Sequence, residues 1–296
     1  MKHIKYLTRK MGSALLLCAI VIISNNSRAQ YSFSVEKTGS GQAVILIPGL
    51  ITSGEVWDES VRALSDQFEC HVITLAGYAG QPPLEQGPYL PTFKNELIRY
   101  IENNNLDKVS LIGHSLGGFL SLLIGLENLA VIERIIVVDA LPFLPALSNP
   151  GVTASFEEEM AMQYFNNLQQ MDDEQRMSFR LMTARSMTND STKWEQLVRW
   201  FNDSDPKTEA YSSFEMMGMD LRHELHELNV PTMVLVPHDE NPDFPLFTGK
   251  MALQMYHDQY AKAPQVQITL VDEAKHFLMY DQPELFIKQI RGFLTE

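Results

Sequence analysis

Short apolar runs alternate along the chain with longer segments in which apolar residues recur at helical spacing. The seven runs that predict strands are residues 33–37, 43–47, 70–75, 108–112, 132–138, 232–236 and 266–271. Runs such as 44–47 and 135–138 are apolar at every position, as strands covered on both faces are. The apolar residues within 93–101 and 285–294 each fall on one face of a helix. This alternation predicts an α/β fold with a mainly parallel central sheet flanked by helices.

The alternation stops between residues 143 and 228, where no strand-like run occurs. This stretch has the pattern of several amphipathic helices rich in Met, Gln and acidic residues. We interpret it as a helical cap, residues 143–228, inserted into a core of residues 30–142 and 229–296. The insertion follows the run at 132–138, which we count as strand 6. The cap methionines, from Met160 to Met219, can either fill gaps between packed helices or form an adaptable apolar wall over a substrate pocket.

The first 29 residues have the pattern of a signal peptide. Four basic residues precede an apolar run at 14–23, and Ser27-Arg28-Ala29 supplies small residues before Gln30. The apolar run is about half of the roughly 20 residues that a membrane-spanning helix needs. We therefore expect cleavage before Gln30 and export, to the periplasm or outside a bacterial cell, with no stable membrane anchor afterwards.

The net charge limits which partners the protein can bind, and the cysteine content limits which disulfides it can form. The formal net charge is −14, and loss of residues 1–29, which hold five basic and no acidic residues, moves it to about −19. Because so negative a chain would repel phosphates, we expect no nucleic-acid partner. The partner that we expect, for reasons given below, is a small-molecule substrate. Cleavage also leaves Cys70 as the single cysteine, which excludes an intramolecular disulfide, and its apolar surroundings predict a buried, inert thiol. The sequence indicates no particular oligomeric state.

The candidate nucleophile is Ser115. The run at 108–112 leads into Gly-His-Ser-Leu-Gly at 113–117 and then into an apolar helix at 119–126, so that G-x-S-x-G stands between a strand and a helix. Such a turn is strained, and Gly113 and Gly117 avoid clashes with the flanking elements. The helix N-terminus adds a positive partial charge, and the N–H of Leu116 can point at an oxyanion. A second donor is the N–H of Leu50, which Gly49 would turn toward Ser115.

A serine needs a general base, and His276 is the best candidate. It follows the last predicted strand on a loop ahead of the closing helix, where the base is expected. His114 lies within the elbow and is better placed to brace the turn. His223 and His226 form His-Glu-Leu-His, one residue short of the zinc-helix spacing and without a third ligand, so we expect no metal site.

These residues resemble the α/β-hydrolase superfamily, of the alpha/beta-hydrolase-1 type, from about Phe33 to the end of the chain. Trp57 and the stretches 75–80 and 275–281 are similar to a group of bacterial exported hydrolases of undefined substrate. The resemblance implies a Ser-His-acid triad in that chain order and no cofactor, but the fold alone does not fix the reaction. Relatives usually have His at the position of Pro48, yet the contact needed there is a backbone one.

The acid of the triad has several candidates. Asp239, Glu240 and Asp243 all follow the run at 232–236. The commonest spacing in the superfamily indicates Glu240, whereas an extended loop with an Asp before an aromatic residue, as in closer relatives, indicates Asp243, which we favour. Asp139 is a further alternative, because some members take the acid from the end of the preceding strand.

We therefore predict a serine hydrolase that cleaves a small or medium carboxylic ester through an acyl-enzyme intermediate. The apolar cap favours a substrate with an apolar acyl or alcohol part. Thioester, amide or C–C bond hydrolysis on the same triad are alternatives. A ligand-binding protein of this fold with little turnover is an alternative from a different class.

Overall fold

The computed structural model describes residues 31–147, 149, 151–155, 157–240 and 248–296. The predicted signal peptide, residues 1–29, and the favoured acid, Asp243, lie outside the described residues. Residues from Tyr31 to Glu296 form one compact unit. Within the described ranges, no helix is both long and apolar enough to cross a membrane.

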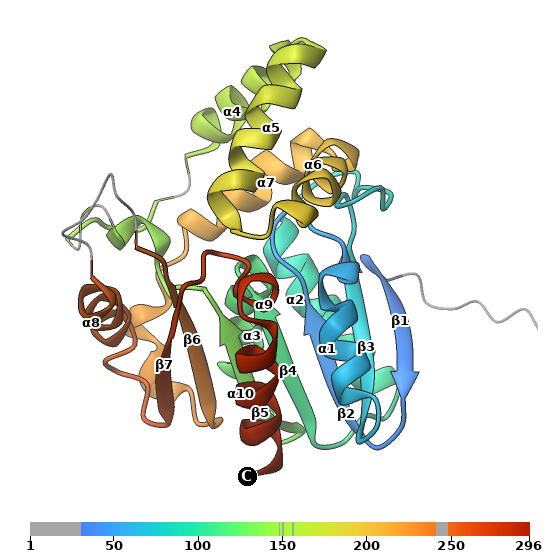
Figure 1. The fold of residues 1–296 in the computed structure, drawn as a ribbon, viewed down its shortest axis with the longest axis vertical. Helices are drawn as coiled ribbons and strands as arrows, with labels where there is room; N and C mark the ends of the chain where they lie inside the picture. Colours follow the sequence, from blue (N-terminus) through green and yellow to red (C-terminus); the bar gives the residue numbers. More distant parts are fainter. Residues whose placement is uncertain (1–30, 148, 150, 156, 241–247) are drawn as a thin grey trace, which may run out of the picture. The chain divides into compact units, whose positions relative to one another are not determined.

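Seven strands form one sheet in the described part of the chain, in the order β1-β3-β2-β4-β5-β6-β7 (Figure 1). Strand β1 pairs antiparallel with β3, and every other pairing is parallel. All seven predicted strands are confirmed. Their bounds are β1 (Phe33–Gly39), β2 (Gln42–Ile47), β3 (Phe68–Leu75), β4 (Val109–His114), β5 (Ile132–Val138), β6 (Thr232–His238) and β7 (Val266–Asp272).

Helices cover both faces of the sheet. Helices α1 (Asp58–Leu64) and α10 (Pro283–Thr295) lie on the face nearer the viewer in Figure 1, and α2 (Tyr89–Asn103) and α3 (Leu116–Gly125) lie behind it. The predicted apolar faces are buried, including Phe93 and Leu97 of α2 and Phe286 and Ile290 of α10. Two further helices are α8 (Gly249–Gln259), which the sequence analysis missed, and α9 (Leu278–Asp281).

Four helices make up most of the cap, and they lie over the edge of the sheet at which the parallel strands end (Figure 1). They are α4 (Glu158–Gln170), α5 (Asp173–Met187), α6 (Trp194–Asp203) and α7 (Pro206–Met217). The insertion follows the strand at 132–138 as predicted, although this strand is the fifth of the described chain, β5. Short 3₁₀ helices lie at Gly54–Trp57, Leu144–Leu147, Ser191–Lys193, Leu221–His223 and Leu225–Glu227.

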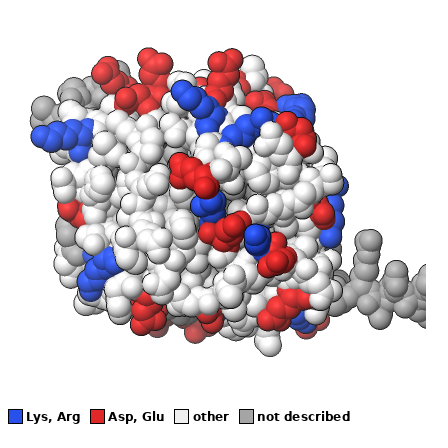
Figure 2. Space-filling model, turned by 90° about the horizontal axis from the view of Figure 1, so that it is seen from below, with Lys and Arg blue, Asp and Glu red and all other residues white. Residues whose placement is uncertain are grey.

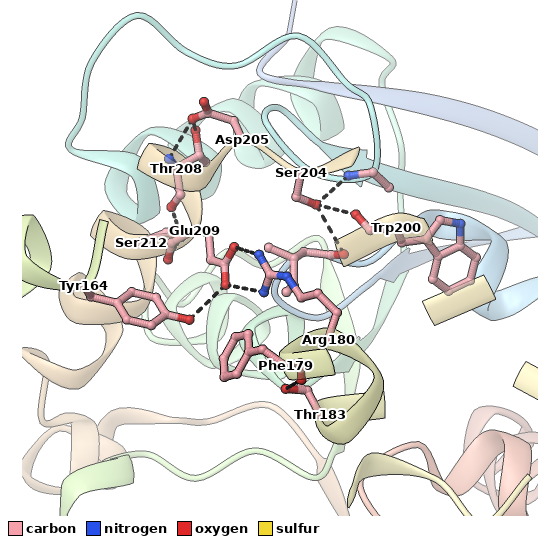
Figure 3. A network of polar contacts seen from close by, with 12 residues as sticks. Tyr164, Phe179, Arg180, Thr183, Trp200, Ser204, Asp205, Thr208, Glu209 and Ser212 are labelled. Atoms are coloured by element: carbon pink, nitrogen blue, oxygen red, sulfur yellow. Dashed lines mark hydrogen bonds and ion pairs between the residues drawn. The ribbon is translucent and has the colours of Figure 1, made fainter. Parts of the chain in front are cut away.

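A buried polar network joins three of the cap helices (Figure 3). Arg180 of α5 donates two hydrogen bonds to the carboxylate of Glu209 on α7, at 2.8 and 2.6 Å. The hydroxyl of Tyr164 on α4 donates to the same carboxylate at 3.0 Å. Arg180 and Glu209 are only 3% and 1% exposed, so the two charges neutralise each other inside the cap.

The cap is also fastened to the core beside the loop that follows β3. The backbone N–H of Ala79 donates to the hydroxyl of Ser204 at 2.9 Å, and that hydroxyl donates to the carbonyl of Trp200 at 2.8 Å (Figure 3). The N–H of Asp205 donates to the carbonyl of Gly77 at 2.7 Å. The Ala-Gly-Tyr-Ala-Gly stretch at 76–80 therefore serves as a docking point for the junction between α6 and α7.

The end of the unit opposite the cap carries acidic and basic side chains interspersed among uncharged ones (Figure 2). Neither sign gathers into one patch on this face. The excess of 37 acidic over 23 basic residues in the sequence is therefore not concentrated there.

Candidate active site

Ser115 occupies a strained turn between β4 and α3. Its backbone angles are φ 53° and ψ −119°, in a region that residues other than glycine rarely adopt. A Cβ on Gly113 would lie 2.1 Å from the carbonyl oxygen of Gly117, and one on Gly117 would lie 2.2 Å from the carbonyl oxygen of Ile47. No side chain fits at either position, so glycine is needed at both to avoid a clash with the neighbouring backbone, as the sequence predicted.

The loop after β2 lies against the elbow. A Cβ built on Gly49 would lie 3.2 Å from the Cβ of Ser115, and Gly49, Leu50 and Ser115 line one cavity. Leu116 is the first residue of α3, so that its N–H has no acceptor within the helix. The structure therefore brings the two predicted oxyanion-binding segments together beside Ser115.

His276 lies on the loop between β7 and α9, and its Nδ1 is 2.5 Å from Oδ2 of Asp139. Asp139 directly follows β5, and its backbone N–H donates to the carbonyl of Leu235 at 3.0 Å. The hydroxyl of Tyr256 on α8 donates to the other carboxylate oxygen of Asp139. Burial, and then the nearby charge of Asp139, raise the pKa of Tyr256 well above its ordinary value, so the phenol keeps the proton that it donates.

Strand register explains why Asp139 reaches the site. In the pairing of β4 with β5, His114 lies opposite Val138, so Ser115 and Asp139 leave the sheet side by side. Glu240 is exposed, and among the described carboxylates it is Asp139 that a hydrogen bond joins to His276. The sequence signal for Asp139 was its place at the end of a buried strand.

His114, which was expected to brace the elbow turn, contacts the loop that carries His276. Its Nε2 lies 2.9 Å from the carbonyl oxygen of His276, and its ring lies 4.4 Å from the His276 ring and 4.7 Å from that of Phe277, centroid to centroid. Burial, and then the neighbouring His276, lower the pKa of His114 well below its usual range. A neutral ring with its proton on Nε2 can donate to that carbonyl.

A cavity of about 510 Å³ opens above Ser115, His276 and Asp139. Its lining is mainly apolar, and the polar network around Arg180 and Glu209 forms part of its cap side. The apolar lining residues include Ile51, Phe119, Ala140, Leu144, Phe179, Met187, Phe201 and Met216. Of the cap methionines, Met187 and Met216 line the cavity, whereas Met160, Met162, Met177 and Met182 are exposed.

Three other residues that the sequence analysis considered, Cys70, His223 and His226, lie apart from this cavity. Cys70 is buried in β3 as predicted, and burial raises the pKa of its thiol to about 11, which keeps it unreactive. The ring of His223 lies 3.1 Å from Nζ of Lys262, and His226 contacts the carbonyl oxygen of His223. Among the described residues, no group of three or more His, Cys, Asp or Glu is placed to hold a metal ion.

Known proteins are similar to this chain in sequence and in fold. The model of the alpha/beta hydrolase family matches residues 44–289. A pimeloyl-[acyl-carrier protein] methyl ester esterase of Vibrio cholerae is 24% identical over 263 residues, which cover 87% of this chain and 96% of that protein.

Two solved structures show the same fold. A hydrolase from Pseudomonas aeruginosa has a TM-score of 0.73 at 16% identity, covering 89% of this chain and 94% of that one. An esterase from Thermogutta terrifontis has a TM-score of 0.71 at 18% identity, covering 89% and 93%. Because the family model spans most of the sequence, the chain belongs to the alpha/beta hydrolase family.

Proposed function

We propose that the protein is a serine hydrolase that cleaves a small or medium carboxylic ester through an acyl-enzyme intermediate. The observation that carries the proposal is the meeting of Ser115, on its strained turn, with the hydrogen-bonded pair of His276 and Asp139 at one cavity. Membership of the family supports a hydrolase. The name of the Vibrio cholerae relative, a methyl ester esterase, supports an ester as the bond that is cleaved.

In the first half-reaction, Oγ of Ser115 attacks the ester carbonyl while Nε2 of His276 takes its proton. We assign Asp139 as the triad acid, because its contact with Nδ1 of His276 holds the ring in the tautomer that leaves Nε2 basic. The N–H groups of Leu50 and Leu116 stabilise the negative oxygen of the tetrahedral intermediate. The intermediate collapses, and His276 returns the proton to the leaving alcohol.

In the second half-reaction, His276 removes a proton from a water molecule that attacks the acyl-enzyme. The second tetrahedral intermediate then collapses and releases the carboxylic acid, while His276 returns the proton to Oγ of Ser115. Every proton in this sequence passes through His276. The steps need no metal ion and no organic cofactor.

The cavity supports an uncharged substrate with an apolar part. Most of its lining is hydrocarbon, which favours alkyl or aryl groups over charged ones. Arg180 and Glu209, a buried ion pair that borders the cavity, neutralise each other. An ester whose acyl or alcohol part is a medium-length apolar chain therefore fits these walls best.

An ester panel on wild type and Ser115→Ala tests this function. We expect the wild type to hydrolyse p-nitrophenyl esters of two to eight carbons, in preference to the matching anilides, and the variant to be inactive. Binding of these esters without turnover would instead support the ligand-binding alternative. Faster cleavage of matched thioesters or anilides would contradict an ester as the substrate class.

We further propose that the protein is exported after removal of residues 1–29. The compact unit beginning at Tyr31 supports this, because cleavage before Gln30 would leave the whole folded unit intact. Mass analysis of the N-terminus of protein from its native cells tests the proposal. Gln30 at the N-terminus is the expected result, and an uncleaved Met1 would contradict it.

A further inference from the structure

Hydrogen bonds to other segments hold the backbone of three consecutive residues, Lys275, His276 and Phe277. The N–H of Lys275 donates to Oδ2 of Asp281 at 2.8 Å, and the carbonyl of His276 accepts from Nε2 of His114 at 2.9 Å. The N–H of Phe277 donates to the carbonyl of Met187 at 2.9 Å. Met187 is the last residue of α5, so the backbone beside the base is bonded directly to the cap.

Asp281, at the end of α9, adds a second connection to the cap. Its Oδ1 accepts from the hydroxyl of Thr188 at 2.6 Å and from the backbone N–H groups of Asn189 at 2.8 Å and Asp190 at 3.3 Å. Its Oδ2 accepts from Lys275, next to the base. One carboxylate therefore bridges the cap turn at 188–190 and the His276 loop, and hydrogen bonds to an ionised acceptor are about twice as strong as neutral ones.

The cap side of this bridge is buried and held by further hydrogen bonds. Thr188 is completely buried, and its carbonyl accepts a hydrogen bond from the indole N–H of Trp194 at 3.2 Å. The Nζ of Lys275 also donates to the carbonyl of Arg185 at 3.1 Å. The turn that follows α5 is thus fixed both within the cap and against the loop of the base.

We propose that Asp281 is a positioning residue for His276. It connects the loop of the base to α5, the cap helix that lines the substrate cavity. This inference rests on the proposed function. Helix α5 lines the cavity with Phe179, Arg180, Thr183 and Met187. Asp281 thereby sets the position of His276 relative to a bound acyl chain. A misplacement of about 1 Å between reacting groups can cost about 100-fold in rate, so loss of the bridge should lower kcat.

The variant Asp281→Asn breaks the bridge with little change in shape. The side-chain amide of asparagine has one oxygen and one NH₂ group, whereas both Asp281 oxygens accept from backbone N–H groups. Whichever way the new amide is turned, its NH₂ group faces an N–H donor, and one half of the bridge is lost. We expect kcat for a p-nitrophenyl ester to fall about 10- to 100-fold, with KM within about threefold of wild type.

A second set of variants tests the cap half alone. Thr188→Val removes the hydroxyl that donates to Asp281 at nearly constant volume, and Thr188→Ser keeps it. Asp190→Asn is the matched control, because its side chain contacts Thr192 and its backbone N–H still reaches Asp281. We expect Thr188→Val to lower kcat several-fold, while Thr188→Ser and Asp190→Asn stay within about twofold of wild type.

Labelling of Ser115 by a fluorophosphonate, measured at least 15 °C below each melting temperature, separates positioning from stability. The proposal predicts that labelling slows in parallel with kcat in Asp281→Asn and Thr188→Val. It is overturned if both variants are labelled at the wild-type rate and only their melting temperatures fall. If Asp281→Asn does not fold, equal labelling rates in Thr188→Val and Thr188→Ser overturn it. Absence of labelling in wild type would instead refute the proposed function.

Discussion

His276 and Asp139 form a hydrogen-bonded pair, with Nδ1 of the histidine 2.5 Å from Oδ2 of the aspartate. The two residues follow the ends of β7 and β5, which β6 separates in the sheet. Tyr256 donates to the second oxygen of Asp139, so the carboxylate is held from two sides. An aspartate held in this way can orient His276 and stabilise its charged form during acyl transfer.

The pair predicts which carboxylate is the triad acid. Asp139→Asn should lower kcat about 10²- to 10⁴-fold with the fold intact, because an amide would favour the wrong tautomer of His276. Asp243→Asn and Glu240→Gln should remain near wild type. Steady-state kinetics on the three variants, with circular dichroism to confirm folding, decides between them. A large loss in Asp243→Asn together with an active Asp139→Asn would return the role to Asp243.

His114 predicts part of the dependence of stability on pH. Its pKa is lowered in the folded state by burial and by His276, whereas in the unfolded chain it returns to about 6.5. Below pH 6.5 the unfolded state therefore binds a proton that the folded state does not, and the free energy of unfolding falls as pH decreases. The slope from one such group is at most about 1.4 kcal/mol per pH unit.

Urea unfolding of wild type and His114→Gln at pH 7.5 and pH 5.5 measures this contribution. The loss of stability on acidification should be smaller in the variant. It should not vanish, because burial also lowers the pKa of His71. An equal loss in both proteins would show that His114 is protonated in the folded state.

The buried pair of Arg180 and Glu209 predicts an asymmetry in stability. Arg180→Met leaves a buried carboxylate without its partner and should lower the free energy of unfolding by about 3–5 kcal/mol. The double variant Arg180→Met/Glu209→Leu should recover most of that loss, because no uncompensated charge remains. Arg199→Met, at an exposed position on α6, is the control and should have little effect. A double variant as unstable as Arg180→Met would contradict this account of the network.

The cap methionines should divide into two groups. Met187→Ala and Met216→Ala remove side chains that line the cavity, so they should shift the preference among esters of different acyl length. Met182→Ala removes a side chain that is 64% exposed and should leave the preference unchanged. Values of kcat/KM across acetate, butyrate, hexanoate and octanoate esters test the division. Equal profiles for all three variants would show that the cavity does not hold the acyl chain.

The fold could be predicted from the sequence because its central strands contain wholly apolar runs, such as 44–47 and 135–138, and its elbow is a local pattern. Gly113, Ser115 and Gly117 carry their structural requirement within five residues. The acid could not be predicted with the same certainty, because the place of Asp139 depends on the register between β4 and β5. The bond from Thr188 to Asp281 spans 93 residues of sequence, and no local pattern marks it.

The site at which a fluorophosphonate attaches to the intact protein tests most directly whether Ser115 is the nucleophile. We expect a single adduct on Ser115, found by mass spectrometry of the digested protein, and no adduct in a folded Ser115→Ala variant. We expect the same loss of labelling in His276→Ala, since the serine then lacks its base. An adduct on another residue, or ester turnover that survives in Ser115→Ala, would contradict the assignment of Ser115 as nucleophile.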